Sequence, residues 1–261
     1  MPNVLVIVPY PLSEQGVANR RAQLAAVDGL EGLKFDYRPV KVAPALGAGY
    51  HDLALFEIAI FEAGCTAEAD GFDAVCIDTM SDSGMKPLRA ALTIPVISPA
   101  IASYHFALTL GSRFSVLTQW DPWVRETYDQ LEQYGLSDRC ASVRTIGVPP
   151  DPTDLLDGKP EIVDALLEEA RRCVNDGADV LCLGSTTMHQ SHAHLAKHLP
   201  IPVINPGPLT YALAKLMLGL GLTHSKTAFP RPTDVEAGVL HAMLNAGAAS
   251  RLKIQGDGVG S

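Results

Sequence analysis

The sequence lacks the features that mark membrane-spanning, secreted and nucleic-acid-binding proteins. Its first apolar run, from Val4 to Val8, stops at a Pro-Tyr-Pro break and is too short for a signal-peptide core or a membrane helix. The formal net charge of −9 comes without a compensating basic stripe, which argues against a nucleic acid partner. We therefore expect a cytoplasmic protein with no nucleic acid and no membrane among its partners.

Cysteine is scarce and irregularly spaced. The cysteines stand at positions 65, 76, 140, 173 and 182, an odd number without any Cys-x-x-Cys pair. This pattern indicates neither a zinc ribbon nor a disulfide framework. Cys76 and Cys182 lie inside apolar segments, where a free thiol usually behaves as a small buried hydrophobe.

The sequence does contain a regular alternation of strand-like and helix-like segments. Hydrophobic residues make up 47% of the chain and charged residues 19%, a balance typical of globular proteins. Helical patterns separate short apolar strands, and parallel strands need such crossover connections. The expected strands cover residues 4–10, 35–42, 73–79 and 95–99, and then 113–119, 140–148, 179–185 and 202–206. The sequence therefore predicts an α/β fold with two parallel sheets covered by helices.

The second set of segments repeats the first. "DGFDAVCIDT" from Asp70 and "DGADVLCLGS" from Asp176 share their Asp-Gly turn, their cysteine and a terminal hydroxyl at a constant offset of 106 residues. Each leads on to a nearly identical segment, "IPVISPA" or "IPVINPG". We expect two pseudo-symmetric lobes facing each other across a cleft, the first formed by residues 1–111 plus 212–261 and the second by residues 112–211.

Both copies end in hydroxyls, at Thr79 and at Ser185. Ligands of parallel α/β sheets bind beyond the carboxyl ends of the strands, so two facing lobes would place Thr79 and Ser185 on opposite walls of one cleft. Residues on two matched walls can contact one prochiral carbon from its two faces. The alternative is that both residues only cap the helices that follow them, which is a common task for Ser and Thr.

Four segments resemble the aspartate/glutamate/hydantoin racemase superfamily, and its hydantoin racemase branch in particular. They are "SDSGM" from Ser81, "GSRFSVLT" from Gly111, "GLSDRCASVRTIGVP" from Gly135 and "LGSTTM" from Leu183, and the likeness covers most of residues 1–215. The resemblance implies a two-lobed fold, no cofactor, a small carboxylate or hydantoin-like substrate, and one catalytic cysteine on each lobe. We also expect a homo-oligomer.

The sequence departs from the family at both catalytic positions, where Thr79 and Ser185 replace cysteine. A thiol needs about 2 kcal/mol to ionise at neutral pH, whereas a hydroxyl of water-like pKa needs roughly 12 kcal/mol. Two-thiol racemisation therefore does not carry over. Three explanations stay open for Ser185: drift to another chemistry, loss of catalysis, or a deliberate exchange of cysteine for serine to trap a ligand.

Other side chains could supply the missing acid or base. His189 follows the second hydroxyl cluster and can exchange protons near neutral pH, and Asp82 or Asp78 could act from the first loop if desolvated. His194 and His198 have the spacing of a metal-binding pair on a helix, but an exposed helix face is the simpler interpretation, and no metal is expected. The expected substrate-binding residues lie at the strand ends: Pro9, Tyr10, Met80, Ser81, Thr118, Thr186, Thr187, Pro206 and Gly207.

Three functions follow from this pattern. The first is a cofactor-independent racemase or epimerase that acts at the acidic carbon of a small carboxylate, amino acid or hydantoin. The second is a lyase, decarboxylase or hydrolase on the same scaffold, because these reactions can proceed with an acid or base on one face only. The third is a small-carboxylate binder without catalysis.

Overall fold

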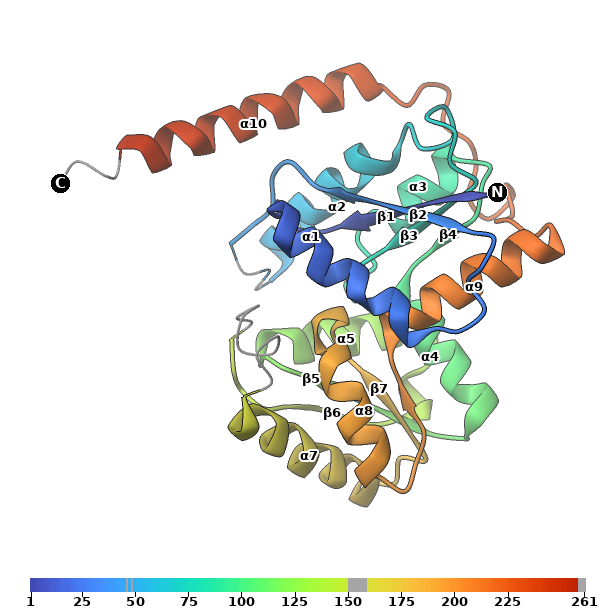
Figure 1. Cartoon of the computed structure of the whole chain (residues 1–261), viewed down its shortest axis with the longest axis vertical. Helices are drawn as coiled ribbons and strands as arrows, with labels where there is room; N and C mark the ends of the chain where they lie inside the picture. The colour runs from blue at the N-terminus through green and yellow to red at the C-terminus, as the bar shows by residue number, and fades with distance from the viewer. Residues whose placement is uncertain (46, 48, 150–158, 258–261) are drawn as a thin grey trace.

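The chain folds into two α/β lobes, each built on a four-stranded parallel sheet (Figure 1). The computed structural model describes residues 1–45, 47, 49–149 and 159–257, with the backbone alone from residue 251 onward. The first sheet has the order β2-β1-β3-β4 and the second the order β6-β5-β7-β8. Their strands are β1 (Asn3–Val8), β2 (Lys34–Pro39), β3 (Ala74–Ile77) and β4 (Val96–Ile97), and β5 (Phe114–Thr118), β6 (Cys140–Thr145), β7 (Val180–Leu183) and β8 (Val203–Ile204). The expected fold class is confirmed.

The central strands of each sheet are buried on both faces. Every residue of β3, β5 and β7 is buried, as the continuous apolar runs require for strands covered by helices on two sides. Helices and short 3₁₀ turns connect the strands: α1 (Glu14–Arg21), η1 (Ala22–Ala26), α2 (Tyr50–Gly64), α3 (Met85–Ala91), α5 (Pro122–Gln133), η2 (Ser137–Arg139), α7 (Pro160–Asn175), η3 (Thr186–Met188) and α8 (His189–His198).

Two helices pack on the sheet of the opposite half of the sequence. Helix α4 (Pro99–Leu110) follows β4 of the first sheet but packs on the second, where Tyr104 stacks on Phe114 at 5.5 Å between ring centroids. Helix α9 (Pro206–Leu220) follows β8 of the second sheet but packs on the first, where Tyr211 lies against Phe35. Figure 1 shows α4 beside β7 and α9 beside β4. The domain division at residues 111/112 and 211/212 stays a prediction.

The two buried thiols of the repeat contact the exchanged helices in the same way. Cys76 donates from β3 to the carbonyl of Thr210 on α9 at 3.7 Å, and Cys182 donates from β7 to the carbonyl of Ser103 on α4 at 3.8 Å. Burial raises the pKa of both thiols, that of Cys76 to about 12. They are packing residues, in agreement with the sequence interpretation.

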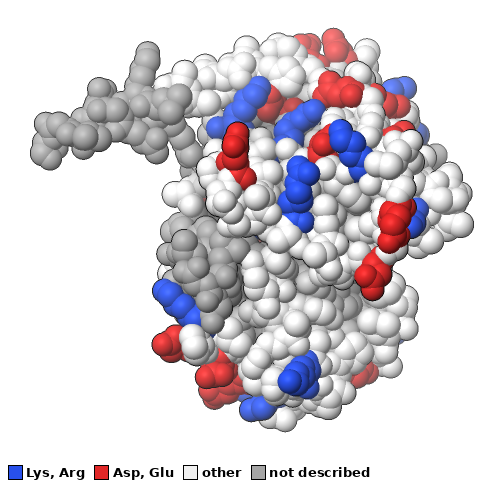
Figure 2. Space-filling model, in the orientation of Figure 1, with Lys and Arg blue, Asp and Glu red and all other residues white. Residues whose placement is uncertain are grey.

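The last helix, α10 (Ala237–Asp257), packs on α2 of the first lobe, and its C-terminal end projects beyond that lobe (Figure 1). Leu244 enters the first core, and His241 pairs with the buried carboxylate of Glu62 on α2. Within the described part of the chain, no helix combines the length and the apolar character that a bilayer crossing requires. On the face seen in Figure 2, acidic and basic side chains intermingle over the first lobe without forming an extended basic area.

Candidate active site

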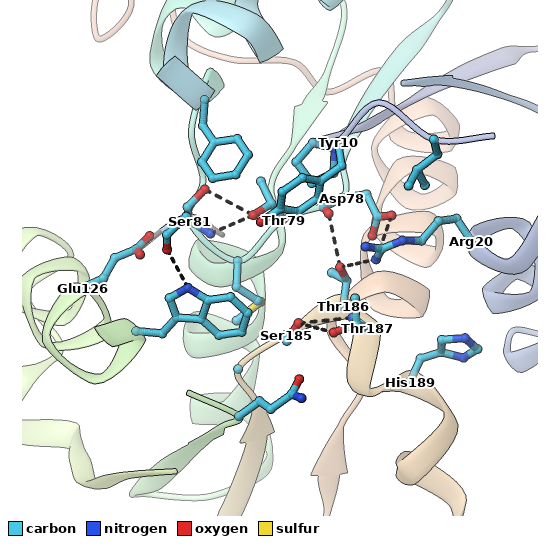
Figure 3. A pocket seen from close by; sticks show the side chains of 18 of the residues that line it. Tyr10, Arg20, Asp78, Thr79, Ser81, Glu126, Ser185, Thr186, Thr187 and His189 are labelled. Atoms are coloured by element: carbon cyan, nitrogen blue, oxygen red, sulfur yellow. Dashed lines mark hydrogen bonds and ion pairs between the residues drawn. The ribbon is translucent and has the colours of Figure 1, made fainter. Parts of the chain in front are cut away.

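A cleft of about 360 Å³ lies between the lobes, at the carboxyl ends of β1, β3 and β7. Both hydroxyl loops reach it, so Thr79 and Ser185 approach one another from opposite lobes (Figure 3). This is the position at which parallel sheets bind ligands. The sequence-predicted residues that line the cleft are Pro9, Tyr10, Thr79, Met80, Ser81, Ser185, Thr186, Thr187 and His189.

The loop after β3 is tied together by its own hydroxyls. Thr79 Oγ1 lies 3.2 Å from Ser81 Oγ and accepts from the Ser81 amide at 3.4 Å. Ser81 in turn bonds the hydroxyl of Ser83 at 2.9 Å. These short local bonds shape the turn, as Ser and Thr side chains commonly do. Thr79 therefore combines a structural role with a place on the cleft wall.

The loop after β7 repeats this arrangement. Ser185 Oγ accepts from the Thr187 amide at 3.3 Å and lies 2.7 Å from Thr187 Oγ1, so it caps the short η3 turn. Ser185 is 8% exposed. The capping role anticipated as an alternative is thus present, and it coexists with a position on the cleft.

An ion pair joins the two loops at one end of the cleft. Arg20, on α1, lies 3.4 Å from Asp78 Oδ2 and donates to Thr186 Oγ1 at 3.0 Å (Figure 3). Thr186 donates onward to the backbone carbonyl of Asp78 at 3.2 Å. Burial raises the pKa of Asp78, whereas Arg20, Thr186 and Gln23 lower it. Arg20 thereby compensates the negative charge of the buried Asp78 carboxylate and holds the second loop against the first.

His189 lies on the cleft at the start of α8, as expected from the sequence. Burial, helped by the positive charge of Arg20, lowers the pKa of His189 to about 4. Its Nε2 atom is buried and has no hydrogen-bond partner among the described residues. The imidazole is therefore neutral near pH 7 and is a weaker base than the sequence alone suggests.

Asp82, expected as a facing base, does not line the cleft. Its two oxygens accept four hydrogen bonds: from Ser98 Oγ, the amides of Ala100 and Ile101, and Tyr134 Oη, at distances from 2.5 to 2.9 Å. Burial raises the pKa of Asp82 while these donors lower it. The carboxylate is therefore engaged at the start of α4, and we assign it a structural role.

Three other expected residues also lie outside the cleft lining. Thr118 is fully buried behind Gly184, where a Cβ atom would come within 3.0 Å of the Thr118 Cβ. Pro206 and Gly207 are buried at the start of α9, and a Cβ on Gly207 would overlap the Gln23 side chain. These positions favour small or compact residues for packing, and the structure does not bring them to the cleft.

One wall of the cleft comes from residues that the sequence interpretation missed. Trp123, Glu126 and Gln130 project from one face of α5, and Gln119 follows β5. Burial raises the pKa of Glu126 to about 7, and the negative charges of Asp82 and Asp129 add to the effect. No sequence motif indicates these residues. On an amphipathic helix, the sequence does not distinguish polar residues that face a cleft from polar residues that face solvent.

Fold and site together define a two-lobed α/β protein with a ligand cleft at its strand ends. Residues 13–214 match the Asp/Glu/hydantoin racemase family model. A hydantoin racemase from Rhizobium meliloti is 32% identical over 169 residues, which are 63% of this chain and 69% of that protein. The chain belongs to the Asp/Glu/hydantoin racemase family.

Solved structures agree with this assignment. An allantoin racemase from Klebsiella pneumoniae superposes with a TM-score of 0.81 at 25% identity, covering 90% of this chain and 95% of that one. An allantoin racemase from Pseudomonas fluorescens gives a TM-score of 0.80 at 25% identity, covering 89% and 97%. These relatives support a racemase-type enzyme.

Proposed function

We propose that this protein is an isomerase that removes and returns the proton at the acidic carbon of a small hydantoin-like or carboxylate substrate, without a cofactor. The observation that carries the proposal is the placement of Thr79 and Ser185 at matching strand ends on one cleft. Two such walls can hold a planar intermediate from both of its faces. The cytoplasmic location and the homo-oligomeric state stay predictions.

The polar groups of the cleft suit a substrate with carbonyl oxygens and N–H groups. Hydroxyls of both loops can donate to a substrate oxygen, and Arg20 adds a positive charge nearby. Gln119 is fully buried, and its Oε1 has no hydrogen-bond partner among the described residues. A buried carbonyl oxygen without a donor is costly, so a shift of the Gln119 side chain toward the cleft would let a substrate N–H group bind favourably there. A hydantoin ring offers both kinds of group.

The test is proton exchange at the substrate carbon. Single enantiomers of substituted hydantoins, allantoin and amino acids are incubated with the protein in deuterated water and followed by NMR and polarimetry. We expect loss of the carbon-bound proton signal together with loss of optical rotation. Ser185→Ala tests whether exchange depends on the cleft. Ser137→Ala is the matched control, because Ser137 is exposed on η2. The proposal fails if no member of the panel exchanges or racemises.

A lyase or decarboxylase is the second candidate. It is favoured by the hydroxyls at both family cysteine positions, since protonation of one face needs only one acid. Adding substituted malonates to the panel separates the two functions: carbon dioxide release with a product of one handedness indicates a decarboxylase, and exchange with racemisation indicates the isomerase.

A further inference from the structure

Glu126 places a carboxyl group on the cleft that none of the hydrogen bonds or ion pairs of the described residues engages. It lines the cavity from the middle of α5, half-buried, and its carboxyl group has no hydrogen bond or ion pair within the described residues. Figure 3 shows its side chain directed from α5 toward Ser81, on the first loop. The other cleft carboxylate, Asp78, is held by Arg20.

Helix α5 is fixed in place on both sides of Glu126. One turn later along the helix, Gln130 donates from Nε2 to the carbonyl of Met80 at 2.7 Å, which docks α5 on the loop that carries Thr79. Almost one turn earlier, Trp123 donates from Nε1 to the carbonyl of Gly47 at 2.8 Å. Residues at this spacing share a helix face, so Glu126 is held beside the first hydroxyl loop.

We propose that the Glu126 carboxyl group is the catalytic acid and base of this cleft, in place of the thiols absent from positions 79 and 185. This inference rests on the proposed function and names the group that moves the proton. A rigid helix positions the carboxyl next to the wall that a substrate must contact, which is what proton transfer to or from carbon requires.

The step balances without any further reactant. The Glu126 carboxylate takes the proton from the substrate carbon, and the electron pair of the broken C–H bond passes into the adjacent carbonyl to form an enolate. Return of the proton from Glu126 restores the starting enantiomer. Protonation by water on the opposite side gives the mirror image, and the hydroxide so formed takes the proton from Glu126. Solvent deuterium enters at carbon directly when water protonates the opposite side, and on return from Glu126 only after the carboxyl proton has exchanged with solvent.

The charge environment of Glu126 fits this task. The titratable groups that interact electrostatically with it are Tyr10 on the loop after β1, Asp82 on the loop after β3, and Asp129 on α5 itself. Burial and the two acidic neighbours raise the pKa of Glu126 to about 7, so both protonation states are populated near neutral pH. A group whose pKa lies close to the working pH is the most effective general acid and base.

The experiment compares three variants with the parent in the exchange assay. Glu126→Gln keeps the shape of the side chain but cannot carry the proton, and we expect the exchange rate to fall at least about 100-fold while substrate still binds in calorimetry. Glu126→Asp keeps a carboxyl group and should retain part of the rate. Glu132→Gln, at an exposed position of the same helix, should exchange like the parent.

The pH profile is the second readout. Because the base must be ionised, the parent rate should rise with pH through about 7, Glu126→Asp should keep such a limb, and any residual rate of Glu126→Gln should lack it. A Glu126→Gln rate equal to that of the parent would overturn the inference and leave the proposed function standing. A parent protein that exchanges no substrate would overturn the proposed function instead.

Discussion

Replacing Asp82 by asparagine should destabilise the whole molecule, because Asp82 is where the first loop, α4 and the end of α5 meet. Its carboxylate binds the amides of Ala100 and Ile101 and the hydroxyls of Ser98 and Tyr134. Asp82 has a φ of 53°, in the left-handed region, which asparagine tolerates far better than alanine does. Asparagine therefore tests the hydrogen bonds without adding backbone strain.

The magnitude follows from the geometry. Each carboxylate oxygen accepts one backbone amide and one hydroxyl. In asparagine an NH₂ group replaces one oxygen: the hydroxyl there can rotate and accept, but the amide cannot. One buried amide left unpaired costs about 1–3 kcal/mol, and loss of charge from the remaining bonds adds to this. We expect the free energy of unfolding to fall by about 3 kcal/mol.

Urea unfolding followed by the fluorescence of Trp120 and Trp123 measures this change. Asp28→Asn, at an exposed turn, should remain within about 0.5 kcal/mol of the parent. Tyr134→Phe removes one of the four donors, and a double-mutant cycle with Asp82→Asn should show coupling between the two residues. A loss below about 1 kcal/mol for Asp82→Asn would refute the account of Asp82 as a structural anchor.

Three further predictions concern the cleft. Ser185→Ala should lower the free energy of unfolding in urea by about 1 kcal/mol, because the cap of η3 is lost. Ser185→Cys should create or increase deuterium exchange, since forming a thiolate costs only about 2 kcal/mol at neutral pH. An unchanged unfolding free energy and an unchanged exchange rate would show that Ser185 neither caps η3 nor reacts. Arg20→Gln should cost at least about 2 kcal/mol of stability at neutral pH, because it leaves the Asp78 carboxylate buried without its positive partner, and the additional change Asp78→Asn should recover part of that loss. Glu126→Gln should gain stability relative to the parent as the pH rises from about 5 to about 8. A pKa raised from 4.5 to about 7 means that ionisation of Glu126 lowers the free energy of unfolding of the parent, by up to about 3 kcal/mol. Parallel curves of unfolding free energy against pH for the two proteins would contradict the raised pKa.

The sequence predicted the architecture well because the repeat supplied independent checks. The apolar strands and the Asp-Gly turns at Asp70 and Asp176 recur in the same order, and the structure places them in two equivalent sheets. The helix at residues 99–110 was not anticipated. Apolar residues occur around its whole circumference, including Phe106 and Leu110 on its exposed face, so no amphipathic period marks it.

The candidate site was predicted only in part, and the reason is spatial. Thr79 and Ser185 could be placed because strand ends of parallel sheets lie at a known edge. Asp82 is three residues from Thr79, yet the left-handed turn directs its carboxylate to the start of α4. Glu126 is held at the cleft by contacts such as that of Gln130 with the first loop, which joins residues 50 positions apart and which no local pattern reveals.

The exchange of α4 and α9 between the sheets constrains how the cleft can open. In the described chain the backbone passes from the first lobe to the second between Ser98 and Pro99, and returns between Asn205 and Pro206. Each connection can act as a pivot, and two pivots define an axis. The lobes can rotate about this axis while α4 stays packed on the second sheet and α9 on the first. Sliding or twisting would pull α4 and α9 off their sheets and expose Tyr104 and Tyr211. We therefore expect the cleft to open by rotation about this axis, which one pair of spectroscopic labels across the cleft would follow.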